Sequence, residues 1–124
     1  MVIRHQDLKV WQKAMDFVDV IYDSTEHFPA AEQFGLCSQL RRAAVSIPSN
    51  IAEGHGRKST KAYINHLSIA FGSLMEIETL IEIALRRKYL DQPMAKTIFV
   101  RTEEIGKMLS GLRKSLKIKA GDPT

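Results

Sequence analysis

The segment from Leu36 to Ile51 constrains the fold most strongly, because its apolar residues recur at spacings of three and four. This spacing places them along one face of an α-helix. The stripe consists of Leu36, Leu40, Ala43, Ile47 and Ile51. Pro48 lies inside the pattern, yet the spacing stays in phase on both sides. Because an internal proline removes one backbone hydrogen bond and bends a helix, we predict one helix from after Pro29 to Glu53, kinked at Pro48. Gly54 should then end it in the left-handed conformation.

Three further segments carry the same helical periodicity. They cover residues 7–26, 59–88 and 91–118. Asp7 and Asp91 are suitable N-cap residues, and Pro93 after Asp91 favours a first helical turn. In the first segment the apolar stripe consists of Leu8, Trp11, Met15, Val18 and Tyr22, and Ala14, Phe17 and Ile21 widen it. Gly72 interrupts the third segment, and we expect it to mark the close approach of a neighbouring helix.

No segment alternates apolar and polar residues in the way a half-buried strand does. Four amphipathic helices with short connections predict an all-α fold, an antiparallel up-down-up-down four-helix bundle. We assign residues 1–118 to this domain and expect residues 119–124 to form a disordered tail. Additional apolar residues lie off the first and third stripes, which favours an oligomer that covers them. These residues are Val10, Phe17, Val20, Ile69, Met75 and Ile83.

Several classes of protein are disfavoured by the sequence. The single cysteine, Cys37, excludes an internal disulfide and is typical of a reducing compartment. There is no signal-peptide pattern at the N-terminus and no apolar run of about 18 residues, so we expect a cytoplasmic protein without membrane association. No histidine follows a glutamate by three positions, and no Gly-x-Ser-x-Gly is present. We therefore predict no enzymatic activity, no metal site and no cofactor.

Basic residues gather near the predicted ends of the second and fourth helices. The chain has a net charge of +4, with an acidic excess up to residue 40 and a basic excess beyond it. In an up-down bundle these two helix ends lie at the same end of the molecule, which favours a polyanion site there. The candidate nucleic-acid-binding residues are Arg57, Lys58, Lys61, Lys117 and Lys119. The alternative is a flexible glycine connector and cations that only complement helix dipoles.

A polar stripe runs beside the apolar stripe of the second helix. Its members are Arg42, Ser46, Asn50 and Glu53. One interpretation is a polar network that fixes register in a seam between helices or subunits. The other is direct contact with a ligand. We favour the structural interpretation and assign these residues to assembly.

Several motifs together resemble a known family, the bacterial four-helix-bundle proteins encoded in intervening sequences of large-subunit ribosomal RNA genes. The matching motifs are Asp7-Leu8, Trp11, Ile21-Tyr22, Phe28-Pro29, Gln39-Leu40-Arg41-Arg42-Ala43, Ser46-Ile47, Asn50-Ile51-Ala52-Glu53-Gly54 and Gly72-Ser73-Leu74-x-Glu76. The resemblance implies an antiparallel bundle that assembles into a ring, a homopentamer. Through similarity to the ring-shaped accessory protein of diversity-generating retroelements, it also implies a role with nucleic acid. It implies no catalytic residues.

These observations predict a non-enzymatic homo-oligomeric bundle that binds RNA or another nucleic acid through its basic residues. The alternative is a structural protein–protein interaction module that binds no nucleic acid, with the polar stripe and the basic ends serving assembly.

Overall fold

The computed structural model describes residues 3–121, and this part of the chain contains helices and no strand. The four long helices and two short 3-10 turns are η1 (His5–Asp7), α1 (Lys9–Thr25), η2 (Ala30–Glu32), α2 (Leu36–His55), α3 (Thr60–Arg86) and α4 (Gln92–Lys119). The predicted all-α helical bundle is therefore confirmed. Helix α4 includes Lys119, which the sequence pattern assigns to the tail, and residues 122–124 of that tail lie outside the described residues.

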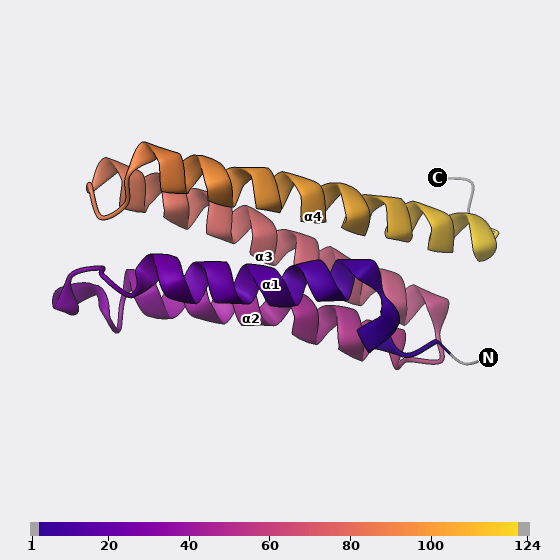
Figure 1. Cartoon of the computed structure of the whole chain (residues 1–124). Coiled ribbons are helices and arrows are strands. Elements are labelled where there is room, and N and C mark those ends of the chain that lie inside the picture. Colours follow the sequence, from indigo (N-terminus) through magenta and orange to yellow (C-terminus); the bar gives the residue numbers. More distant parts are fainter. Residues whose placement is uncertain (1–2, 122–124) are drawn as a thin grey trace.

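The four helices lie side by side, and Figure 1 shows the chain reversing direction at each connection. Each helix contacts the next in the sequence, and α1 also contacts α4, which closes the bundle. The α2–α3 connection and the C-terminal end of α4 lie at one end of the molecule (Figure 1). The connections α1–α2 and α3–α4 lie at the opposite end.

The apolar stripe predicted for α2 forms part of the core. All five of its members are buried, which agrees with the expectation for this helix. The core as a whole draws on every helix, and its largest fully buried side chains are Phe17, Ile21, Leu40, Ile47, Ile51, Leu67, Leu74, Ile77, Ile81, Ile98, Ile105 and Leu109.

The stripe predicted for α1 faces the core only in part: Ala14, Phe17 and Ile21 are fully buried, and Leu8, Trp11 and Val18 are partly buried against the core. The core-facing residues are Val10, Ala14, Phe17, Ile21 and Thr25, and all of them are buried. Met15 and Tyr22 of the predicted stripe are each 42% exposed. The two stripes are adjacent on one broad apolar arc, and packing against α2 and α4 decides which of them is covered. An apolar line therefore remains on the outer side of α1.

Side-chain caps fix the starts of α3 and α4. Ser59 Oγ accepts from the backbone N–H of Ala62 at 3.2 Å, and Asp91 Oδ1 accepts from that of Met94 at 3.0 Å. The N-cap predicted at Asp7 is wrong: α1 begins at Lys9, with no side-chain cap at its start. Asp7 instead accepts from the backbone of Arg4 and closes the preceding 3-10 turn.

Helix α2 runs without interruption from Leu36 to His55 with Pro48 inside it, and the bend expected at that proline stays a prediction. Gly54 does not adopt the predicted left-handed position, since it lies within the helix and is buried. A Cβ atom at Gly54 would lie 2.8 Å from His66 Cβ and 2.9 Å from Tyr63 Cδ1. Position 54 therefore requires a glycine, because α3 approaches too closely to leave room for a side chain. Gly72, predicted to have that role, is exposed, and a Cβ atom added at this position would have no neighbour within 4 Å.

Candidate functional site

A line of polar side chains, here called the polar seam, joins α2 to α3. It consists of Ser46, Asn50, Glu53, His66 and Ser73. Ser46 Oγ lies 2.9 Å from Ser73 Oγ, and His66 Nδ1 lies 3.0 Å from Asn50 Oδ1. The Glu53 carboxylate is 3.5 Å from the same ring nitrogen. The structure therefore brings three of the four predicted assembly residues into one network between helices of the same chain.

The hydrogen bonds of the polar seam form a chain in which each side chain donates to the next, from His66 through Asn50 and Ser46 to Ser73. The amide nitrogen of Asn50 donates to the Ser46 backbone carbonyl at 2.9 Å and to Ser46 Oγ at 3.1 Å. Its oxygen is therefore left to accept from His66, which requires the proton on Nδ1. Ser46 Oγ, already an acceptor, can then donate to Ser73. Within the described residues no buried side-chain polar atom lacks a hydrogen-bond partner, so none in the seam is left unsatisfied, and the seam fixes the register of α2 on α3.

Arg42, the fourth predicted member, lies outside the polar seam. Its side chain is exposed, and its guanidinium forms no hydrogen bond or ion pair with another side chain of residues 3–121. The neighbouring Arg41 is the structural arginine. Its Nε donates to Thr25 Oγ1 at 2.9 Å, and its guanidinium lies 4.7 Å from the Tyr22 ring centroid. The two arginines point in different directions because consecutive residues differ by about 100° around a helix.

The predicted cation cluster is divided between two edges of one bundle end. Arg57 and Lys58 are exposed in the α2–α3 connection, and Lys61 is exposed in the first turn of α3. Lys119 is exposed and Lys117 is half-buried in the last turn of α4. Figure 1 places both groups at the same end. Because α2 and α4 make no direct contact within the described part of the chain, the groups flank this end instead of meeting at a point.

Carboxylates are absent from two of the helical stretches at this end, whereas η1 and the last turns of α2 contribute Asp7 and Glu53 (Figure 1). The sequence has no Asp or Glu from Gly54 to Met75 or from Ile105 to Gly121. The two stretches are neighbours, because Arg113 of α4 donates to Ser68 Oγ of α3 at 3.2 Å. The Arg113 guanidinium also lies 5.0 Å from the Phe71 ring centroid. We call this surface the basic end; its positive charge is uncompensated by acidic side chains of its own helical stretches.

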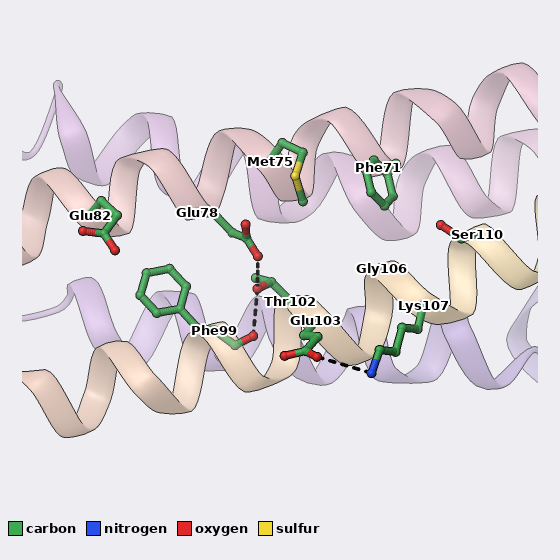
Figure 2. Close-up of a pocket in the computed structure, with 10 residues that line it drawn as sticks. All are labelled: Phe71, Met75, Glu78, Glu82, Phe99, Thr102, Glu103, Gly106, Lys107 and Ser110. Atoms are coloured by element: carbon green, nitrogen blue, oxygen red, sulfur yellow. Dashed lines mark hydrogen bonds and ion pairs between the residues drawn. The ribbon is translucent and has the colours of Figure 1, made fainter.

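A groove of about 740 Å³ lies between α3 and α4 and overlaps the basic end, because Phe71, Met75, Gly106, Lys107 and Ser110 of its lining belong to the two stretches without carboxylates. We call it the α3/α4 groove, and Figure 2 shows the side chains that line it. Its apolar part comes from Phe71, Met75 and Phe99, and glutamates enter it from both helices. Thr102 Oγ1 donates to Glu78 Oε2 at 2.6 Å, and Lys107 pairs with Glu103 at 3.3 Å. Its lining residues are Phe71, Met75, Glu78, Glu82, Phe99, Thr102, Glu103, Gly106, Lys107 and Ser110.

Two side chains have perturbed acidity, and neither lies in the α3/α4 groove. Burial raises the pKa of the Cys37 thiol; Arg41 opposes this effect and Glu32 adds to it. Burial likewise raises the pKa of the Tyr63 phenol. Both groups are thus held in their neutral forms at neutral pH, which does not favour nucleophilic chemistry. Within residues 3–121 there is no cluster of three or more His, Cys, Asp and Glu side chains that could hold a metal ion.

The fold and these surfaces define a class of protein: an all-α helical bundle with an internal polar seam, a basic end and an apolar groove. The family model for the 23S rRNA-intervening sequence protein matches residues 6–111, and the chain belongs to this family. The family resemblance seen in the sequence is thereby confirmed. No curated protein matches the chain.

A solved structure with a similar fold comes from Bacteroides thetaiotaomicron VPI-5482. It is described as a protein with unknown function from the S23 ribosomal protein family. The two chains are 26% identical, with a TM-score of 0.77, over 85% of this chain and 95% of that chain. The similarity supports the same arrangement of helices along nearly the whole of both molecules. Among the described residues, no helix is long and apolar enough to cross a membrane.

Sequence reasoning missed the partners that complete these surfaces. His66 and Ser73 complete the polar seam, and they are 16 and 27 residues from the α2 side chains they contact. The Thr102–Glu78 bond in the α3/α4 groove joins residues 24 apart. His66 and Ser73 are separated by seven positions, a helical repeat that places them on one face of α3. That spacing is the one signal in the sequence that could have identified the seam's second half.

Proposed function

We propose that the protein is a non-enzymatic, cytoplasmic homo-oligomer, a pentameric ring as its family resemblance implies, that binds RNA or another nucleic acid at the basic end. The observation that carries the proposal is the absence of carboxylates from residues 54–75 and 105–121, which contribute α3 and α4 to this end. A surface that concentrates cations without internal ion pairs keeps them available for phosphates, which dominate the affinity of proteins for nucleic acids.

Arg57, Lys58 and Lys61 are the primary phosphate ligands in this proposal. They are exposed and flank the start of α3, where free backbone N–H groups and the helix dipole also favour anions. Lys117 and Lys119 add charge from the last turn of α4. Aromatic rings are few on this surface, since Phe71 already stacks against Arg113 and Tyr63 is half-buried. Binding through the backbone charge, without reading of bases, is therefore expected.

The test is a fluorescence-anisotropy titration of a short labelled single-stranded RNA at two salt concentrations. Arg57→Ala with Lys58→Ala should weaken binding and reduce the salt slope by about one for each phosphate that the protein no longer binds. The matched control is Arg86→Ala with Arg87→Ala, which removes the same charge from exposed residues at the opposite end of α3. Equal weakening in both variants would indicate nonspecific attraction by net charge. No change in the first variant would refute the assignment of the basic end.

A structural interaction module is the second candidate, favoured by the polar seam and by the apolar α3/α4 groove. In this case the wild-type protein forms an oligomer but shows no salt-dependent RNA binding. Arg42→Ala or Glu53→Ala would then dissociate the oligomer, which light scattering measures directly. Because both candidate functions include an oligomer, the RNA titration is the measurement that separates them.

A further inference from the structure

Two faces of the bundle expose apolar side chains that a soluble monomer would leave uncovered. One is the α3/α4 groove, in which Met75 is 39% exposed. The other lies along α1 and α2 on the outer side, where Tyr22 and Val45 are each 42% exposed and Phe34 is 91% exposed. A nearly fully exposed phenylalanine makes little contribution to folding of its own chain. Such patches mark surfaces of interaction.

The side chains that line the hollows of the two faces carry opposite charge. Glu78, Glu82 and Glu103 enter the α3/α4 groove, and Lys107, the cation among its lining residues, is already paired with Glu103. The outer side of α1 and α2 forms a second hollow, and both Phe34 and Arg42 line it. The Arg42 guanidinium pairs with no carboxylate of residues 3–121. We call this surface, with Tyr22, Phe34, Arg41, Arg42 and Val45, the α1/α2 face. An apolar groove with excess carboxylates is complementary to an apolar face with an available guanidinium.

From this complementarity we propose that the α1/α2 face of one copy packs into the α3/α4 groove of a second copy, with Arg42 beside the groove glutamates and Phe34 against its apolar lining. The proposal rests on the proposed oligomer and deepens it by naming its interface. Because the two surfaces differ, the contact is heterologous, and repeated rotation generates a ring when it closes.

The two surfaces lie at matching heights along the bundle, as an interface generated by rotation about an axis parallel to the helices requires. The Ser46–Ser73 bond sets these two residues level, so one turn further on Arg42 is level with the α3 turn that contains Glu78. The Thr102–Glu78 bond places the α4 side of the groove at that same height. Rotation about an axis parallel to the helices changes no heights. It therefore carries Arg42 of one copy to the level of Glu78 of the next, with Glu82 about one turn farther along α3.

A charge exchange tests the interface. Arg42→Glu and Glu82→Lys should each shift the oligomer toward monomer at micromolar concentration, as measured by light scattering and sedimentation. The combination of both substitutions in one chain should restore the oligomer, because every interface then regains an opposite pair. Both side chains are exposed, so circular dichroism should show folded protein in each variant. Phe34→Ser should weaken assembly and likewise leave the helical signal unchanged.

Glu76→Lys provides the matched control, because it makes the same charge change on α3 at an exposed position outside the groove lining. It should leave the oligomer intact. If the wild-type protein is a monomer, both the oligomer and this interface are refuted. If the wild-type protein is an oligomer that none of the three groove or face substitutions weakens, the interface alone is refuted. If the single substitutions dissociate it and the combination fails to restore it, the pairing of Arg42 with the groove glutamates is refuted.

Discussion

His66 Nδ1 in α3 lies 3.0 Å from Oδ1 of Asn50 in α2, which joins the two helices midway along the polar seam. Asn50 makes this contact while its amide nitrogen donates to Ser46. One amide thus satisfies groups on both sides of the seam. Since the atoms are partly buried, water replaces a missing partner poorly, and removal of the amide leaves polar groups unsatisfied.

Asn50→Ala should therefore lower the free energy of unfolding by about 1–3 kcal/mol, the cost of stranding buried hydrogen-bonding groups. Urea denaturation monitored by circular dichroism measures the change. Ser49→Ala is the matched control, because Ser49 is exposed and bonds only to the Val45 carbonyl of its own helix. Its effect should stay within about 0.5 kcal/mol. Equal effects of the two substitutions would contradict a stabilising role for the seam.

Gly54 and Gly72 should respond in opposite directions to substitution by alanine. A Cβ at Gly54 would lie 2.8 Å from His66 Cβ, so Gly54→Ala must push α3 away or strain the contact. We expect it to destabilise the fold by about 1–3 kcal/mol, as overpacking does. Gly72→Ala meets no neighbour within 4 Å and should stabilise it by about 0.5–1 kcal/mol through helix propensity. Thermal denaturation of the two variants checks this, and stabilisation by both would show that the α2–α3 contact adjusts freely.

Several features that depend on local sequence could be predicted correctly, whereas features that depend on the neighbouring helix could not. Helix starts at Ser59 and Asp91 and the buried stripe of α2 depend on local spacing and local capping, and the structure bears them out. The core-facing side of α1 and the role of Gly54 depend on which helix lies opposite, which periodicity within one segment does not contain. Three of the four polar-stripe residues join one network. Their α3 partners were missed for the same reason.

Arg41 is predicted to stabilise the α1–α2 contact within one chain. Arg41→Ala removes the hydrogen bond to Thr25 Oγ1 at 2.9 Å and the guanidinium that lies 4.7 Å from the Tyr22 ring centroid. From the usual contributions of such interactions we expect the free energy of unfolding to fall by about 1–2 kcal/mol. Gln39→Ala, at an exposed site on the same helix, should be nearly neutral. A neutral Arg41→Ala variant in urea denaturation would show that solvent replaces both interactions.

The last prediction concerns alkaline pH. Burial raises the pKa of the Cys37 thiol above its usual 9.0 and that of the Tyr63 phenol above its usual 10.0. The folded state therefore retains protons that the unfolded state releases, so the free energy of unfolding falls as pH rises. This stability is fully present below the unfolded pKa values and is lost as pH rises through the folded ones.

Urea midpoints measured between about pH 8 and about pH 11 should accordingly decrease, with a negative slope set by the protons that the folded state retains. Cys37→Ala and Tyr63→Phe should each make the slope less steep, whatever their effect on stability at pH 8. The slope is the informative quantity, because a small cavity or a missing hydroxyl shifts all midpoints together. Lys58→Ala, at an exposed site in the α2–α3 connection, serves as a control that should leave the slope unchanged. A wild-type midpoint that stays constant up to about pH 11 would contradict the coupling of the Cys37 thiol and the Tyr63 phenol to folding.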